Sequence, residues 1–179
     1  MDISERLNNT IKTIPDFPRK GILFRDLAPV MLDSVLVKDV VAGLAEPFFG
    51  CGITKVMGIE SRGFLFGAML AQSLGCGFVM IRKGGKLPGA VAEIGYGLEY
   101  GEAVIEVQKE GVISGDKVLI HDDLLATGGT AAAAAALVQG LGGGVEGFSF
   151  VVELSYLDGR DKLRNFSRRI YSLVTFSQE

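Results

Sequence analysis

The fold is decided by residues 118–130, VLIHDDLLATGGT, where a short apolar run meets two carboxylates and then a glycine turn. The first four residues are typical of the end of a buried strand, and the run of alanines after the turn predicts a helix over 128–142. Backbone N–H groups at such a turn point out of the helix N-terminus, where the helix dipole is positive and anions bind. The stretch therefore predicts a site for an anion.

This turn contains no lysine, so we expect backbone and hydroxyl groups to hold the anion, an arrangement that suits a monophosphate. We call the turn the phosphate cradle, and its expected members are Ala126, Thr127, Gly128, Gly129 and Thr130.

Asp122 and Asp123 precede the cradle. A sugar 5′-phosphate in the cradle would leave its ribose over the strand end, where ionised carboxylates accept hydrogen bonds from the two ribose hydroxyls. The alternative is an acid that caps the helix beside a solvated neighbour, and the residues alone leave both interpretations open.

Working outward, strands are predicted over 55–60, 77–83, 103–108, 116–122, 144–154 and near 169–174, and helices over 2–14, 35–48, 61–75, 128–142 and near 159–165. An irregular loop is predicted from Gly84 to about Gly95. Strands that alternate with helices favour an α/β fold with a mostly parallel central sheet flanked by helices. With no linker or repeat visible, we expect one domain over residues 1–179.

Basic side chains follow two other predicted strands. ESRGF ends one with Glu60 and Arg62, and IRKGGK ends the next with Arg82, Lys83 and Lys86. Taken singly, each is most often a solvated surface charge. In a parallel sheet, however, these ends share one edge with the two aspartates, and open α/β sheets bind ligands at that edge. The cations are numerous enough to neutralise a pyrophosphate.

Composition excludes several classes of function. The net charge is −3, which gives no reason to expect a nucleic-acid partner, and no stretch is apolar and long enough to predict a membrane span. A chain with one histidine and two separated cysteines does not predict a zinc site. A G-x-G-x-x-G pattern at 142–147 follows a helix and opens a strand, which is the reverse of the dinucleotide-binding order.

Several motifs together carry a resemblance to a known family. The stretch VLIHDDLLATGGT resembles the signature of type I phosphoribosyltransferases, and further segments are similar to the adenine phosphoribosyltransferases among them. These segments are DFPRKGILFRDLAPV (16–30), GIESRGFLFG (58–67), IRKGGKLPG (81–89), LEYG (98–101) and VVELSYLDGR (151–160). The resemblance covers about residues 5–165, and the motifs in this order are far more specific than any one of them.

The resemblance implies a purine salvage enzyme that transfers the 5-phosphoribosyl group from phosphoribosyl pyrophosphate (PRPP) to adenine, giving AMP and pyrophosphate. It also implies Mg²⁺ held mainly through PRPP and water rather than by a protein metal site, and a homodimer. The two cysteines, Cys51 and Cys76, are far apart in the sequence, and we expect two reduced thiols in a cytoplasmic protein. The family fold adds a small hood, here about residues 1–34 with the C-terminal part, and a flexible lid loop over about 84–101. A cis peptide between Glu60 and Ser61 is a further expectation.

Residue roles follow from the same resemblance. Phe24 is expected to stack on the purine, Leu154 to cover its other face and the Arg25 backbone to read its edge. Glu99 and Arg62 are expected to be catalytic, with Glu99 managing a proton on the base. The remaining substrate-binding residues are expected to be Arg82, Lys83, Lys86, Tyr100, Asp122, Asp123, Ala126, Thr127, Gly128, Gly129 and Thr130.

The sequence departs from the family pattern at three places. His121 stands where an aliphatic residue is usual, and we expect a structural role for it. Gly84 replaces a residue that is often larger, which predicts a looser loop, and the tail after Asn165 matches no motif. Two alternative functions stay open: transfer to another purine base such as hypoxanthine or guanine, and a non-catalytic module that senses PRPP.

Overall fold

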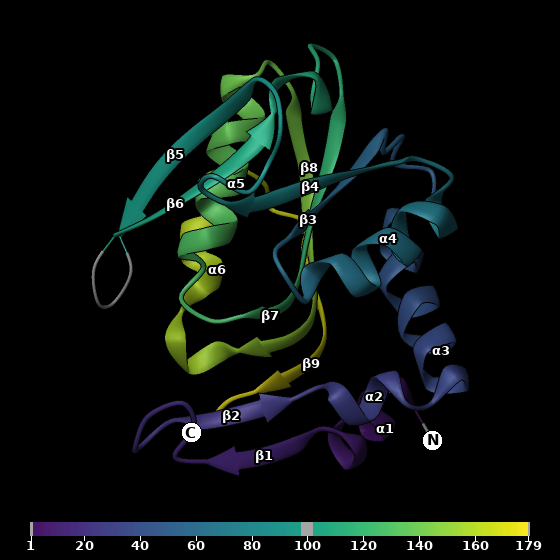
Figure 1. Cartoon of the computed structure of the whole chain (residues 1–179). Coiled ribbons are helices and arrows are strands. Elements are labelled where there is room, and N and C mark those ends of the chain that lie inside the picture. Colours follow the sequence, from purple (N-terminus) through teal and green to yellow (C-terminus); the bar gives the residue numbers. More distant parts are fainter. Residues whose placement is uncertain (1, 98–101, 179) are drawn as a thin grey trace.

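The computed structural model describes residues 2–97 and 102–178. Its centre is a sheet of seven strands in the order β5-β6-β4-β3-β7-β8-β9, shown in Figure 1. Their bounds are β3 Lys55–Ile59, β4 Gly77–Lys83, β5 Val91–Gly97, β6 Glu102–Gln108, β7 Lys117–Leu125, β8 Gly144–Leu154 and β9 Ile170–Phe176. The five strands β4, β3, β7, β8 and β9 are parallel, while β5 and β6 add an antiparallel pair beside β4. The prediction of a mostly parallel sheet is confirmed.

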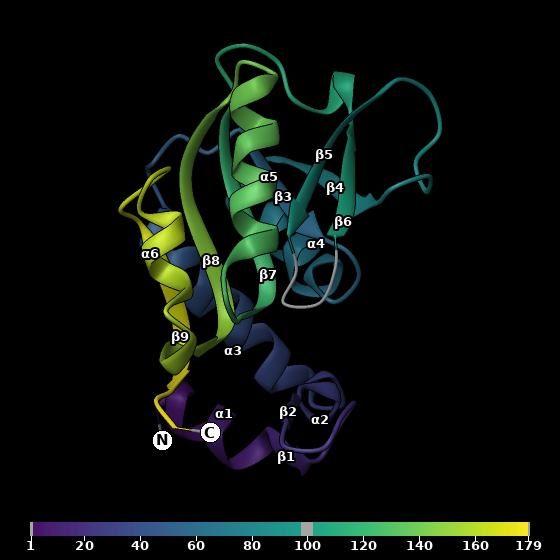
Figure 2. The ribbon, with the colours of Figure 1, turned by 90° about the vertical axis from the view of Figure 1, so that its left-hand side faces the viewer.

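Helices cover both faces of this sheet. The helices are α1 Ile3–Thr10, α2 Ala28–Met31, α3 Ser34–Ala45, α4 Gly63–Leu74, α5 Gly129–Gly140 and α6 Gly159–Leu163. Buried side chains form two clusters, one that includes α3 and α4 and one that includes the alanines of α5. Figure 2 shows α5 and α6 on the face opposite α3 and α4. Alanines on α5 let the helix pack close to the strands, so their small size is a packing feature.

The N-terminal segment differs from the prediction of one helix over 2–14. The helix α1 ends at Thr10, and residues Lys12–Pro15 form strand β1, which pairs antiparallel with β2 (Leu23–Asp26). The physical reason lies in Pro15, which disfavours the helical conformation of the residue before it, and in the β-branched residues at 11, 13 and 14. The resulting β1–β2 hairpin lies below the carboxyl ends of the parallel strands in Figure 1.

The prediction of an irregular loop from Gly84 to about Gly95 is wrong in its second half. Residues Val91–Gly97 form β5, which pairs with β6 along its whole length. The alternation of buried and exposed residues expected for 103–108 is wrong, because Ile105, Glu106 and Val107 are all buried where β6 lies between β4 and β5. The predicted lid therefore consists of a turn at 84–90, strand β5 and residues 98–101, which lie outside the described residues; closure of this segment stays a prediction.

Strand β7 is longer than predicted and ends at Leu125, so both aspartates lie within it. The cause is β8, which continues to Leu154 and keeps pairing with the β7 backbone beyond Asp122. The unmatched tail forms β9 at the edge of the sheet, beside β8. In the described residues, no helix combines the length and the apolar character needed to cross a membrane.

Candidate functional site

The phosphate cradle lies between the end of β7 and the start of α5. Gly128 caps α5 with a φ of +74°, a left-handed conformation that side chains rarely adopt. The pocket at this turn is lined by Asp122, residues 124–131 and Phe150. All five cradle residues predicted from the sequence line this pocket, with backbone N–H groups at a helix N-terminus where an anion is favoured.

Gly159, the first residue of α6, supports the cradle from behind. A Cβ on Gly128 would lie 2.5 Å from the Gly159 carbonyl oxygen, and a Cβ on Gly159 would lie 2.2 Å from that of Ala126. Neither position accepts a side chain without displacing backbone. This contact was missed from the sequence, because it joins segments about 30 residues apart and only GR in the 151–160 motif hints at it.

A partly buried ion pair between Arg160 and Glu153 holds α6 in that place. Arg160 donates from Nε to Glu153 Oε1 at 2.6 Å and from Nη2 to Oε2 at 2.7 Å, and its Nη1 donates to the Ile170 carbonyl. Ser172 donates its hydroxyl to the same carboxylate. Glu153 is 4 % exposed, and its hydrogen bonds outweigh the effect of burial, so its pKa lies below the ordinary value. The pair links β8, α6 and β9 behind the cradle.

Asp122 and Asp123 lie between the cradle and Arg62. The Arg62 Nε is 2.8 Å from Asp123 Oδ2, and Asp122 Oδ1 accepts from the Asp123 N–H. Burial, followed by the neighbouring Asp123 carboxylate, raises the pKa of Asp122 well above its usual range. Burial also raises the pKa of Asp123, against the opposing Arg62 charge. This direction of the Asp122 pKa opposes the ionised form expected from the sequence, and the role of both aspartates toward a ribose stays a prediction.

His121 is fully buried and does not line either pocket of the site. Its imidazole faces Gly67 of α4, and its backbone lies opposite Ser149 of β8. Burial lowers the pKa of His121 to about 4, so the neutral form is favoured. This environment agrees with the structural role expected from the sequence.

A second pocket adjoins the cradle, and we call it the cation pocket. It is lined by Ile59, Glu60, Ile81, Arg82, Lys83, Tyr96, Ile105, Asp122 and Thr130. Asp122 and Thr130 belong to both pockets. The parallel pairing of β3 with β4 and β7 brings these strand ends to one edge, as the sequence predicts. The pocket at the helix N-terminus thus lies directly beside a pocket with positive side chains.

The predicted cations occupy different places around this pocket. Arg82 donates to Glu60 Oε1 at 2.9 Å and to the Lys86 carbonyl at 3.1 Å. Lys83 lines the pocket, whereas Lys86 and Arg62 do not. The Arg82 hydrogen bond holds the pKa of Glu60 below its ordinary value. The peptide between Glu60 and Ser61 is cis, as expected.

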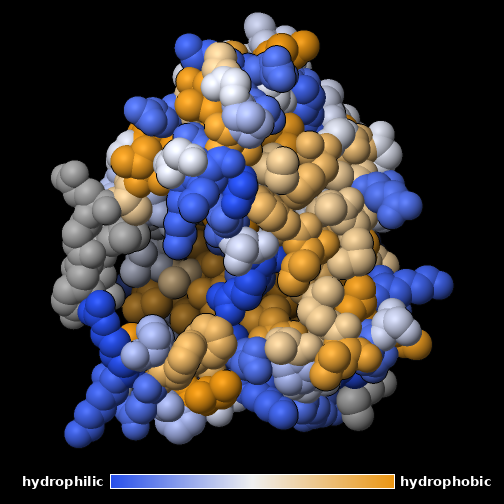
Figure 3. Space-filling model, viewed as in Figure 1, coloured by the Kyte–Doolittle hydropathy of each residue, from blue (hydrophilic) through white to orange (hydrophobic). Residues whose placement is uncertain are grey.

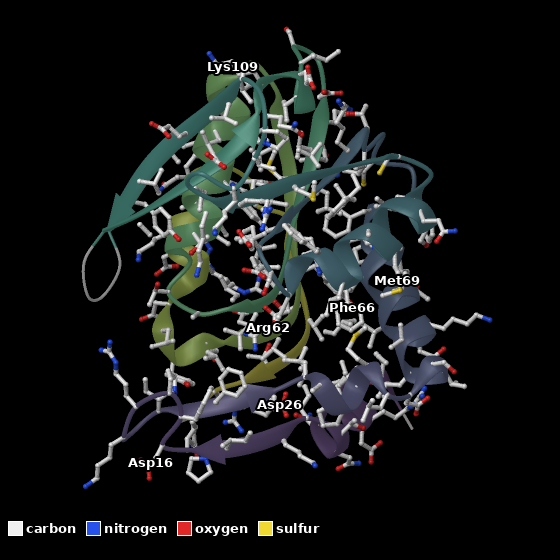
Figure 4. The ribbon with its side chains drawn as sticks, in the orientation of Figure 1. Asp16, Asp26, Arg62, Phe66, Met69 and Lys109 are labelled. Carbon is white, nitrogen blue, oxygen red and sulfur yellow. The ribbon has the colours of Figure 1, made fainter. Side chains whose placement is uncertain are left out.

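The β1–β2 hairpin brings Phe24 and Arg25 to the same edge. The Arg62 guanidinium lies 5.2 Å from the centre of the Phe24 ring, and Figure 4 shows Arg62 between the strand ends and β2. In Figure 3 the molecule is hollowed between the hairpin and the strands above it. Leu154 ends β8 and is 8 % exposed within the core. Because the Arg62 side chain contacts both the Phe24 ring and Asp123, Phe24 lies near the aspartates.

Two further residues of the site were missed from the sequence. The Tyr96 hydroxyl of β5 lies 3.1 Å from the Thr130 hydroxyl of the cradle. The Phe176 ring of β9 lies 4.0 Å from the Arg25 guanidinium, which also donates to the Thr13 hydroxyl. Because β5 and the tail carry no recognised motif, only their strand-like alternation offered a signal. Glu99 and Tyr100 lie outside the described residues.

The family model described as phosphoribosyl transferase domain matches residues 33–152. An adenine phosphoribosyltransferase of Methylococcus capsulatus is 49% identical over 172 residues, 96% of this chain and 99% of the relative. The chain belongs to the adenine phosphoribosyltransferase family. This membership accounts for all six motifs at once.

Solved structures of the family agree with the fold. The adenine phosphoribosyltransferase of Giardia lamblia complexed with 9-deazaadenine has a TM-score of 0.93 at 40% identity and covers 99% of both chains. That of Saccharomyces cerevisiae, complexed with adenine and an imino-altritol bisphosphate, has a TM-score of 0.89 at 40% identity, over 96% of this chain and 98% of the other. The adenine phosphoribosyltransferase fold therefore extends over nearly the whole chain, including the β1–β2 hairpin and the tail.

Proposed function

We propose that this chain transfers the 5-phosphoribosyl group from PRPP to adenine and releases AMP and pyrophosphate, a purine salvage reaction. The observation that carries the proposal is the pair of adjoining pockets that share Asp122 and Thr130. A donor with a monophosphate at one end and a pyrophosphate at the other requires two such compartments. The names of the relatives, and the adenine and 9-deazaadenine complexes of two of them, support adenine as the acceptor.

In this proposal the 5′-phosphate lies in the cradle, and the ribose lies over Asp122 and Asp123. Ribose hydroxyls are hydrogen-bond donors, which suits buried carboxyl groups with few other partners. Fixing both ends of the sugar holds the anomeric carbon between the pyrophosphate and the base, so part of the entropic barrier is removed before the reaction.

The pyrophosphate is assigned to the cation pocket. As the bond from C1′ to the pyrophosphate oxygen breaks, negative charge grows on the leaving group, and preorganised positive charge stabilises it. Arg82 and Lys83 line the pocket, and we assign Arg62 and Lys86 to the same task. Arg62 requires a movement away from Asp123 to reach it.

Mg²⁺ is proposed as the cofactor. Mg²⁺ prefers oxygen ligands and keeps part of its water shell, so we propose that PRPP oxygens and water hold most of its coordination sites. The carboxylates that line the two pockets are Asp122 and Glu60, and Asp123 adjoins Asp122 on β7. When bound, the cation would neutralise diphosphate charge and favour the ionised form of these carboxyls.

For the base, we propose that adenine stacks on Phe24 with Leu154 on its other face. Backbone groups at Arg25 would accept from the 6-amino group and donate to N1. A 6-oxo purine presents the opposite pattern, so buried groups would stay unpaired at a cost of ~1–3 kcal/mol each. The Arg62 guanidinium near Phe24 would have to leave this position for the base to stack.

Glu99 and Tyr100 are proposed to act from the lid. The bond from C1′ to N9 of adenine forms while the bond to pyrophosphate breaks, and the base loses one proton. Glu99 is the candidate general base, which accepts this proton from N7 of the purine. Closure of residues 84–101 would exclude water, which competes as a nucleophile. The proposal also includes a hood made of residues 1–34 with the tail, a homodimer and a cytoplasmic location.

Steady-state assays with PRPP and each of adenine, hypoxanthine and guanine, with and without Mg²⁺, test the function. We expect AMP from adenine with Mg²⁺, and little product from the two 6-oxo bases. Turnover of hypoxanthine or guanine but not adenine would favour the first alternative. PRPP binding by calorimetry without turnover of any base would favour the non-catalytic sensing module.

A further inference from the structure

The turn that follows β4 is held by a carboxylate from another strand. Glu106 of β6 is 2 % exposed, and its Oε1 accepts from the backbone N–H groups of Lys86 at 2.7 Å and Leu87 at 2.6 Å. Its Oε2 accepts from the Gly85 N–H at 3.0 Å. Three consecutive backbone donors thus converge on one side chain.

Such a run of N–H groups forms a concave site that ordinarily attracts an anion. Here the protein supplies the anion itself, and hydrogen bonds to an ionised acceptor are stronger than those to a neutral one. The bonds from Gly85 and Leu87 lower the pKa of Glu106 below its ordinary value, so the charged form is favoured. The turn at 84–88 is therefore tied down although it begins with two glycines, and the looser loop expected from Gly84 is not what these contacts indicate.

The same turn connects to the cation pocket. Arg82 lies directly opposite Glu106 in the pairing of β4 with β6. Its guanidinium donates to the Lys86 carbonyl on one side and to Glu60 on the other, and the Lys83 N–H donates to the second Glu60 oxygen. Two carboxylates thus hold the segment 82–87 from opposite sides, and neither the β4 end nor the turn can shift without breaking these bonds.

We propose that Glu106 is a positioning residue for pyrophosphate: it fixes the turn that sets where Arg82 and Lys86 present their charges. Glu106 itself does not line either pocket, so it acts through the backbone of residues 85–87. The inference rests on the proposed function in assigning pyrophosphate to these cations. The geometry of the turn stands independently of that assignment.

The test uses the full-length variants Glu106→Ala and Glu106→Gln. A matched control is Glu93→Gln, because Glu93 lies directly opposite Glu106 on β5 and is exposed. Three quantities are measured for each protein: hydrogen exchange of the amides of residues 85–87, the dissociation constant of inorganic pyrophosphate, and the KM values for PRPP and adenine in AMP formation.

In Glu106→Ala we expect faster exchange of the three amides, and about tenfold weaker pyrophosphate binding and a PRPP KM raised about tenfold, with the adenine KM within about twofold of wild type. Glu106→Gln keeps one acceptor oxygen, so its exchange rates and constants are expected to lie between those of wild type and Glu106→Ala. Glu93→Gln is expected to match wild type. If the alanine variant does not fold, the glutamine variant decides by the same measurements.

Unchanged amide exchange and unchanged pyrophosphate binding would overturn the inference. Equal rises in the two KM values would overturn it as well, because a purely structural role affects both substrates. If wild type forms no AMP, the proposed function fails, and amide exchange together with pyrophosphate binding still decides the inference.

Discussion

The phosphate cradle and the cation pocket adjoin each other but are built in opposite ways. The cradle is one contiguous stretch, residues 126–130, whose ligand groups are mainly backbone N–H donors at a helix N-terminus. The cation pocket draws side chains from β3, β4, β5, β6 and β7. Close packing determines the arrangement of the cradle, since the contact of Gly128 with Gly159 of α6 leaves no space for a Cβ. Charged groups determine the arrangement of the cation pocket, since Glu60 and Glu106 accept hydrogen bonds from residues 82–87, which carry its basic side chains.

This difference predicts which substitutions each half of the site, the cradle and the cation pocket, tolerates. A methyl group added at Gly128 displaces backbone, whereas we expect the cation pocket to be sensitive to the loss of a carboxylate. Asp122 and Thr130 belong to both halves, so a change there affects both.

Gly128→Ala tests the control of the cradle by shape. The new Cβ would lie 2.5 Å from the Gly159 carbonyl at a φ of +74°, so we expect a loss of at least about 2 kcal/mol in the free energy of unfolding and at least about 100-fold weaker PRPP binding. Urea unfolding and calorimetry measure the two quantities. The control is Gly140→Ala at the other end of α5, where a Cβ meets nothing within 4 Å; a Gly128→Ala protein that binds PRPP as tightly as Gly140→Ala would break the comparison.

His121→Val tests the strand that carries the cradle. Burial lowers the pKa of His121 from 6.5 to about 4, so the unfolded chain takes up a proton below pH 6.5 that the folded chain refuses until about pH 4. Stability is therefore lost as the pH falls through this window, by about 3 kcal/mol in total. Urea unfolding from pH 7 to pH 4 is expected to show a shallower loss in the valine variant, and parallel profiles for the two proteins would refute the assignment.

Asp122→Asn tests the residue shared by both halves. We expect turnover to fall about 10- to 100-fold, because the amide cannot provide the ionised carboxylate that a bound cation would favour and that accepts from the ribose hydroxyls. Because its pKa is raised in the fold, ionisation of Asp122 costs stability as the pH rises above its unfolded value. The variant should therefore melt at a higher temperature than wild type at pH 7 and show little difference at pH 3.5.

The exposed Asp161→Asn serves as control for that variant, since its side chain is 68% exposed and a change there is expected to affect neither quantity. An Asp122→Asn protein with full turnover, or one that is less stable than wild type at pH 7, would contradict the account of this residue.

Phe176→Leu tests whether the tail supports the purine side. The Phe176 ring under the Arg25 guanidinium steadies the strand whose backbone is assigned to the adenine edge, and a cation–π contact of this kind is worth about 0.5–2 kcal/mol. We expect the adenine KM to rise about threefold and the PRPP KM to stay constant, with Phe176→Tyr restoring wild-type values. A rise in the PRPP KM alone would place the effect in the other half of the site.

The cradle could be predicted from the sequence because its information is local. A buried strand, a glycine turn and an alanine-rich helix occur in order within 118–142, and strand bounds such as Gly77–Lys83 and Gly144–Leu154 agree with the structure. Charges at the ends of β3 and β4 were also located, since parallel pairing brings such ends together.

Contacts that depend on distant residues could not be predicted in the same way. Gly159 behind the cradle, Glu106 behind the turn and Phe176 beneath Arg25 each depend on a packing partner from another element. Strand β5 was missed because only its pairing with β6 makes the segment regular. The raised pKa of Asp122 was missed for a related reason, since its surroundings include Gly63 at the start of α4, which is distant in sequence.

A crystal structure with AMP and pyrophosphate bound together would show directly which of the two pockets holds the AMP phosphate and which holds the pyrophosphate. The account predicts the AMP phosphate on the backbone of residues 126–130, the adenine on Phe24 and the pyrophosphate beside Arg82 and Lys83. An AMP phosphate bound among those basic side chains, with the pyrophosphate in the cradle, would contradict it.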